Sequence, residues 1–145
     1  MNLKTMAIAI NIVTAFFTFA LSFASQAATL KISPKGEQLL FDQTAFTVKA
    51  GEKVKLTFNN TSSMQHNWVL TAPGTADKIA QDSITAGAAK GWLAIGPDVL
   101  AHTKLVDPKK TDTIDFVAPT KPGDYPFICS FPGHAMTMKG ILTVK

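Results

Sequence analysis

The sequence contains a single cysteine, Cys129, which excludes a fold held together by an intramolecular disulfide. A domain of this size must then be stabilised by a buried apolar core. Cys129 begins the segment Cys-Ser-Phe-Pro-Gly-His-Ala-Met-Thr-Met, which also contains His134 and ends at Met138. A second histidine, His66, lies far upstream. Two imidazoles, one thiolate and one weakly binding thioether are the ligand set of an electron-transfer copper site.

Residues 1–27 have the pattern of a secretory signal peptide. A short positive start precedes an almost wholly apolar run over residues 6–24, and Ser25-Gln26-Ala27 then offers the small residues of a cleavage site. We expect cleavage after Ala27, which leaves residues 28–145 as one exported, periplasmic domain. The alternative is an uncleaved N-terminal anchor, because the run approaches the roughly 20 residues that a membrane helix needs. No later segment is apolar enough to span a membrane.

A lone cysteine in an exported protein requires an explanation. An exposed free thiol would oxidise or form a dimer in an oxidising compartment. A bound metal would protect the thiol of Cys129, whereas the alternative is a buried, inert side chain that acts as a small hydrophobe. The histidine and methionine that follow Cys129 favour the metal.

The charge pattern does not indicate nucleic-acid binding. The formal net charge is +4, and every basic residue is a lysine. Arginine, which best suits bidentate contacts to phosphates and bases, is absent. The lysines alternate with apolar residues, which is typical of the solvent face of strands. They serve solubility or a mild preference for acidic partner surfaces.

Short alternating segments predict an all-β sandwich of seven to eight strands. The clearest is Lys53–Phe58, in which Val54, Leu56 and Phe58 share one face. The other extended or short apolar segments are residues 30–33, 38–41, 46–49, 67–71, 113–117, 125–129 and 139–144. Residues 75–89 predict a short helix, with Thr75 as its cap, that packs as a flap on a sheet. We expect an irregular segment over residues 87–102.

The spacing of the polar residues places the candidate ligands together. Cys129 ends a predicted strand, and Pro132-Gly133 is a strong turn signal that folds the chain back so that His134 faces Cys129. Met138 comes just before the last strand. His66 lies where a polar loop meets a strand, so it can approach from a neighbouring strand.

These motifs resemble the cupredoxins, and in particular the azurin and auracyanin-like small blue, or type 1, copper proteins. The matching segments are residues 64–70, 123–129, 131–134 and 138–140 together with the closing strand. The resemblance implies a Greek-key β-sandwich that holds one copper ion per chain. It implies that His66, Cys129 and His134 are the strong ligands and that Met138 is the weak axial ligand. Met136 is a rival for the axial position because of its proximity.

The resemblance also implies supporting roles. Asn67 would hydrogen-bond to the ligand loop near Ser130 and brace the thiolate, although it could instead be a polar residue at a strand edge. His102 has no partner motif and is expected on the surface. Trp68 and Trp92 are expected to be packing residues and not electron relays.

The sequence departs from azurins in two ways. Azurins have a glycine before the first histidine ligand, where this chain has Gln65, so a contact from that carbonyl to copper is left open. Azurins also have a disulfide, which a single cysteine excludes here. Both departures favour the auracyanin-like branch.

We therefore expect a monomeric one-electron carrier that cycles between Cu(I) and Cu(II) and is not an enzyme. Its redox partners would bind transiently at an apolar patch around His134, formed by Gln65, Phe131, Pro132, Gly133, Ala135 and Met136. Three histidines are too few for a multicopper oxidase or nitrite reductase, and one cysteine excludes a dinuclear site. Cys/His hydrolysis lacks an orienting acid. The remaining alternative is a copper storage or delivery protein.

Overall fold

Alternation of lysine with apolar residues produces the central strand of the smaller sheet. The computed structural model describes residues 27–145, and the predicted signal peptide otherwise lies outside them. Strand β3 (Lys53–Asn59) buries Val54, Leu56 and Phe58 on one face, as predicted. It lies between β1 (Ala28–Ile32), to which it is parallel, and β6 (Thr111–Val117), to which it is antiparallel.

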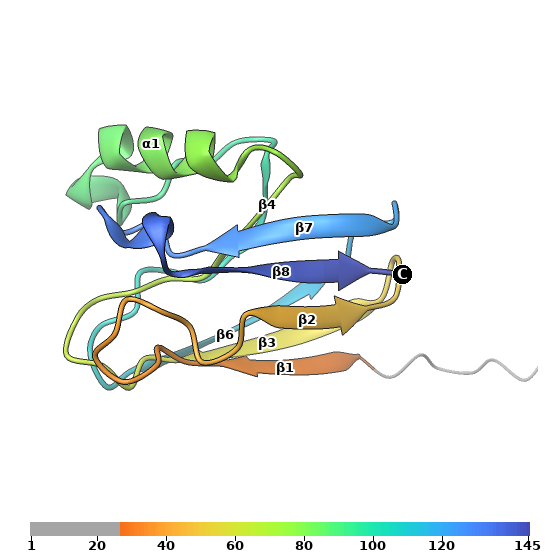
Figure 1. The fold of residues 1–145 in the computed structure, drawn as a ribbon, viewed down its shortest axis with the longest axis horizontal. Coiled ribbons are helices and arrows are strands. Elements are labelled where there is room, and N and C mark those ends of the chain that lie inside the picture. Colours follow the sequence, from red (N-terminus) through yellow and green to blue (C-terminus); the bar gives the residue numbers. More distant parts are fainter. Residues whose placement is uncertain (1–26) are drawn as a thin grey trace, which may run out of the picture.

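The second sheet contains five strands, and the candidate ligands lie in loops next to the ends of its strands. Its order is β2 (Ala45–Val48), β8 (Lys139–Val144), β7 (Gly123–Ile128), β4 (Val69–Thr71) and β5 (Val99–His102). Within this five-stranded sheet, β2 and β8 pair in parallel and the other neighbouring strands are antiparallel. The consecutive strands β2 and β3 therefore belong to different sheets, and the intervening turn carries the chain from one layer to the other (Figure 1).

Aromatic side chains fill the space between the two sheets. The ring of Phe127 from β7 lies 5.7 Å from that of Trp68, which in turn lies 5.8 Å from Phe116 of β6. A glycine is required at position 140 of β8, because a Cβ atom there would lie 2.3 Å from Phe127 Cζ and 2.5 Å from the carbonyl oxygen of Thr44. The expected β-sandwich is thus confirmed, with eight strands in residues 27–145.

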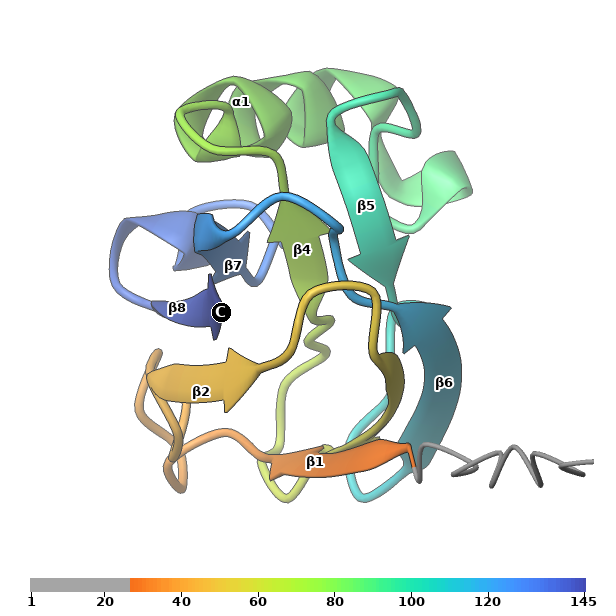
Figure 2. The same ribbon diagram turned by 90° about the vertical axis from the view of Figure 1, so that its right-hand side faces the viewer.

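The predicted helical flap is also present. Helix α1 (Ala76–Ala86) lies on the outer face of the five-stranded sheet (Figures 1 and 2). Its Ile79 packs in a second apolar cluster with Val69, Leu93 and Ile128. Thr75 is the N-cap residue of this helix, as predicted, but its hydroxyl makes no capping hydrogen bond. It donates instead to the carbonyl of Ala72, 2.8 Å away, in the preceding turn.

Two further details differ from the expectations. Residues 99–102, predicted to be irregular, form β5 at the edge of the five-stranded sheet, after the short 3₁₀ helix η1 (Ala88–Lys90). In the apolar segment 38–41, only Phe41 forms a bridge, with Pro34, and residues 38–40 form a bend. In the part of the chain that is described, no helix has the length and apolar character needed to cross a membrane.

Candidate metal centre

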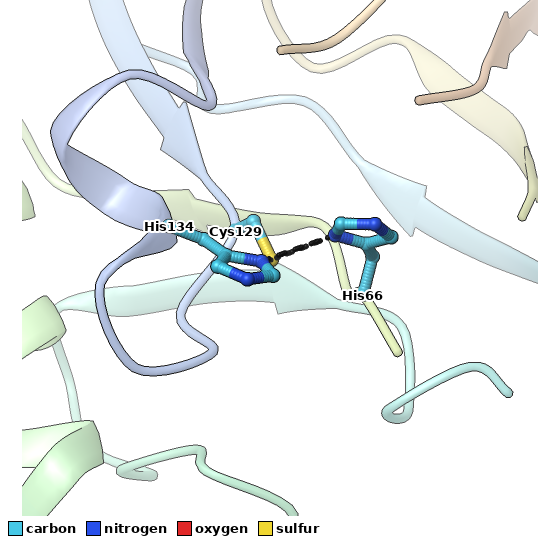
Figure 3. Close-up of side chains that lie close together, drawn as sticks. All are labelled: His66, Cys129 and His134. Carbon is cyan, nitrogen blue, oxygen red and sulfur yellow. Dashed lines mark hydrogen bonds between the residues drawn. The ribbon is translucent and has the colours of Figure 1, made fainter. Parts of the chain in front are cut away.

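The side chains of His66, Cys129 and His134 converge at one end of the sandwich. The Nδ1 atoms of the two histidines lie 3.1 Å apart, and Cys129 Sγ lies 3.8 Å from Nδ1 of His66 and 3.6 Å from Nδ1 of His134. The close-up view shows the thiol facing both imidazole rings (Figure 3). All three side chains are buried. The sequence prediction that these residues lie together is confirmed.

The donor geometry fits a single metal ion. For a first-row ion with bonds of about 2.0 Å to nitrogen and about 2.3 Å to sulfur, three donors in a trigonal plane lie roughly 3.5–3.8 Å apart. The two nitrogen–sulfur distances match this arrangement, and the nitrogen–nitrogen distance is slightly shorter. Two imidazoles and a thiolate in a trigonal set are the strong ligands of blue-copper sites. The residues present therefore fit copper.

The ligand loop is shaped by a turn and by short backbone hydrogen bonds. Cys129 follows β7 directly, and its N–H donates to the carbonyl of Met138 at 3.0 Å. Gly133 has a φ of 80°, a left-handed conformation that glycine adopts without strain, so the predicted turn is confirmed. His134 then begins the 3₁₀ helix η2 (His134–Met136), and its carbonyl accepts the N–H of Met138 at 2.8 Å.

The two candidate axial methionines have opposite environments. Met138 is fully buried and belongs to the same apolar cluster as Cys129. Met136 is 78% exposed and lies at the surface beside the loop. Of the two, Met138 is therefore the one that the fold holds inside the molecule, in the same apolar cluster as Cys129.

Asn67 connects the two halves of the site, as the resemblance implied. Its amide oxygen accepts the backbone N–H of Ser130 at 2.8 Å, and its amide nitrogen donates to Ser130 Oγ at 2.8 Å. Ser130 Oγ in turn donates to the carbonyl of Trp92, 2.6 Å away. Trp92 has an unusual φ of 53°, and its ring lies edge-on to Phe131 of the ligand loop. Trp68 is fully buried in the core, and Trp92 packs against Phe131.

Sequence reasoning missed the residues that hold the outer nitrogen of His66. His66 Nε2 lies 2.9 Å from Ser62 Oγ, and that hydroxyl lies 2.9 Å from Asn60 Oδ1. Both residues belong to the polar loop just upstream of His66. The one signal that pointed to them was the clustering of Asn, Thr and Ser residues just upstream of His66, which are residues that hydrogen-bond locally.

Burial keeps all three donor side chains uncharged at neutral pH. It lowers the pKa of His66 from 6.5 to about 4, with a further contribution from the nearby His134, and it also lowers the pKa of His134. Burial raises the pKa of the Cys129 thiol to about 11, although backbone hydrogen bonds from Asn67 and Phe131 oppose the shift. The imidazoles are therefore ready to bind a metal, whereas the thiol must lose a proton when the metal enters.

His102 takes no part in this cluster. It ends β5, is partly exposed, and its Nδ1 lies 3.0 Å from the carbonyl of Thr103. Gln65 lies next to the site, but its side-chain amide points to Asp107, to which it donates a hydrogen bond of 2.6 Å.

Comparison with known proteins shows the family to which this chain belongs. A family model described as copper-binding proteins of the plastocyanin/azurin family matches residues 28–145. The chain belongs to the plastocyanin/azurin family. It is 40% identical to auracyanin-A of Chloroflexus aurantiacus over 121 residues, which cover 81% of this chain and 74% of the relative. It is 38% identical to azurin of Pseudomonas denitrificans over 118 residues, which cover 75% of this chain and 92% of that azurin.

Solved structures agree with this membership of the plastocyanin/azurin family. The structure of auracyanin A, described as a "blue" copper protein from Chloroflexus aurantiacus, superposes with a TM-score of 0.78 and 38% sequence identity. The match covers 83% of this chain and all of that chain. The predicted cupredoxin resemblance, its fold and its copper cofactor are thus confirmed.

Proposed function

We propose that this protein is a one-electron carrier that holds one copper ion between His66, Cys129 and His134, with Met138 as the weak axial ligand. Bound copper supplies the one-electron couple between Cu(I) and Cu(II). The observation that carries the proposal is the convergence of two Nδ1 atoms and one Sγ atom, 3.1–3.8 Å apart, in a buried site. Met138 is preferred to Met136 because Met138 is buried in the same apolar cluster as Cys129, whereas Met136 is exposed.

Rigid bracing favours electron transfer over storage or delivery. Asn67 and Ser130 join the His66 side of the site to the ligand loop by two hydrogen bonds of 2.8 Å each. Donor atoms that are held in place need little rearrangement when the charge on the metal changes. A protein that releases its metal to a partner instead needs an accessible, mobile ligand set. The sequence contains three histidines and one cysteine, which are too few for the further copper site of a multicopper oxidase or nitrite reductase, and this favours a carrier over an enzyme.

We also propose where the electron partners bind and where the protein works. The surface around His134 includes the half-buried Phe131 and Pro132 and the strongly exposed Met136. Small apolar contacts of this kind suit transient redox encounters by a monomeric carrier, whose interfaces lie at the low end of the size range. The signal-peptide pattern of residues 1–27 supports export to the periplasm.

Voltammetry of the copper-loaded protein tests the carrier against the delivery protein. We expect a reversible one-electron wave and retention of copper in both oxidation states during incubation with a competing chelator. A control voltammogram of the metal-free protein should show no wave. If the protein instead loses its copper to the chelator in either oxidation state during repeated cycles, it is a delivery protein and the proposed carrier function is overturned.

A further inference from the structure

The two histidines of the site are held in different ways. The Nδ1 atom of His66 faces Cys129 and His134, and its other ring nitrogen, Nε2, lies 2.9 Å from the hydroxyl of Ser62. The hydrogen-bonding contacts of the His134 ring that the described residues provide go through Nδ1, toward the site itself. The His134 ring is otherwise positioned by packing on Phe131, with ring centroids 4.7 Å apart.

The hydrogen bond between His66 and Ser62 has a fixed direction when His66 binds a metal through Nδ1. An imidazole that ligates through Nδ1 carries its proton on Nε2, so His66 donates to Ser62 Oγ. The Ser62 hydroxyl then donates its own proton to one of two acceptors, Asn60 Oδ1 at 2.9 Å or the carbonyl of Met64 at 3.2 Å, and the contact to Asn60 is the shorter. Asn60 Oδ1 is identified as the acceptor end because the Asn60 amide nitrogen donates to two carbonyls, those of Met64 at 2.7 Å and Val106 at 2.9 Å.

This chain of hydrogen bonds is closed off from water. His66 and Ser62 are each 1% exposed and Asn60 is fully buried. The backbone continues the bracing, because His66 and Val106 exchange N–H to carbonyl hydrogen bonds of 3.2 and 2.8 Å. Removing the Ser62 hydroxyl would leave a buried N–H without a partner, which a protein interior disfavours.

We infer that Ser62 is a positioning residue of the copper site, oriented by Asn60, which fixes the tautomer and ring orientation of His66 and raises its basicity toward copper. Hydrogen bonding from the outer nitrogen of a ligating histidine has these effects in metal sites, and losing it costs about 10–100-fold in metal affinity. A more basic imidazole stabilises Cu(II) more than Cu(I), because the ion of higher charge gains more from a stronger donor. The inference rests on the proposed function.

The first test uses the unaltered protein. Nitrogen-15 NMR of the metal-free protein and of its Cu(I) form should show His66 as the neutral tautomer with its proton on Nε2. The proton should exchange slowly with solvent because its partner is buried. A proton on Nδ1 of His66 in the Cu(I) form would overturn the inference without any substitution.

The second test compares Ser62→Ala with two other variants. Ser62→Ala should weaken Cu(II) binding about 10–100-fold, weaken Cu(I) binding less, and so raise the reduction potential. Ser62→Thr keeps the hydroxyl and should restore both values. Ser63→Ala is the matched control in the same loop, since Ser63 is exposed and bonds to Glu37, with its hydroxyl 2.7 Å from the Glu37 carboxylate.

The outcomes separate this inference from the proposed function. If the unaltered protein binds no copper, the proposed function fails. If the unaltered protein binds copper but Ser62→Ala keeps its affinity and potential, the role of Ser62 fails and the copper site stands. A loss of affinity in Ser62→Ala that is equal for Cu(I) and Cu(II), with no change in potential, would reduce Ser62 to a merely structural residue and also overturn the inference.

Discussion

At the scale of single residues, burial sets the protonation of the ligands before a metal arrives. The imidazole of His66 is neutral because charging it in the interior is costly, and the Cys129 thiol retains its proton for the same reason. Copper therefore competes with a proton at the sulfur but not at the two nitrogens. The site therefore favours an ion that binds thiolate strongly, and copper is such an ion because thiolate is a soft ligand.

The lowered pKa of His66 predicts how the stability of the metal-free protein depends on pH. In the unfolded chain His66 takes up a proton as the pH falls below 6.5, whereas in the folded protein it does so only near pH 4. The unfolded state thus binds more protons in this window, and the free energy of unfolding falls as the pH decreases from 6.5 toward about 4. The lowered pKa of His134 acts in the same direction.

Urea unfolding of the metal-free protein at about pH 7 and about pH 5 measures this effect. The variant His66→Asn removes the titrating group and serves as the comparison, since its free energy of unfolding should fall less between the two pH values. An equal fall in the two proteins would contradict the assignment of the pKa shift to His66.

At the scale of elements, helix α1 is held by a single apolar face. Ile79 is 3% exposed and packs on Val69 and Ile128, whereas Ile84 on the same helix is 42% exposed. The helix therefore covers the five-stranded sheet close to the strand that leads into Cys129. Its attachment depends on the size of the side chain at position 79.

Ile79→Ala should lower the free energy of unfolding by about 2–5 kcal/mol, because it leaves a cavity between α1 and the sheet. Ile84→Ala is the matched control on the same helix and should change the free energy of unfolding by less than about 0.5 kcal/mol. Chemical denaturation of the two variants provides the comparison. Similar losses in both would mean that the helix does not bury the face assigned to it.

The sequence predicts those elements whose pattern is local. Strand β3 follows from its alternation, and the turn before His134 follows from Pro132-Gly133. Strand β5 could not be predicted, because residues 99–102 have no alternation of their own and become a strand by pairing with β4. The hydrogen bond of the Thr75 hydroxyl could not be predicted, because this hydroxyl can bond either to the first turn of the helix or to the preceding turn. Only the folded structure shows that it bonds to the preceding turn.

The candidate site shows the same contrast between features with a local sequence pattern and features that depend on long-range contacts. His66, Cys129 and His134 were predicted because the residue types and their spacing carry the chemistry. Ser62 and Asn60 were missed because a buried hydrogen-bond network in a polar loop has no periodic signature. Their role depends on long-range contacts, such as that between Asn60 and the carbonyl of Val106, which no local pattern indicates.

At the scale of the whole molecule, the two sheets act as a rigid frame for loops that are far apart in sequence. Asn67 joins the β4 side to Ser130 after β7, and Asn60 joins the upstream loop to Val106. The chain therefore brings two separate segments into one site with a core of apolar residues and without a disulfide.

Titration of the purified protein with Cu(II), followed by visible absorption, tests the copper site most directly. We expect an intense charge-transfer band from the Cys129 thiolate that grows until one copper is bound per chain and then stops, as in blue-copper sites. The variant Cys129→Ser should retain the fold by circular dichroism and lack the band. A protein that binds copper and stays colourless, or a band that persists in Cys129→Ser, would contradict the site described above.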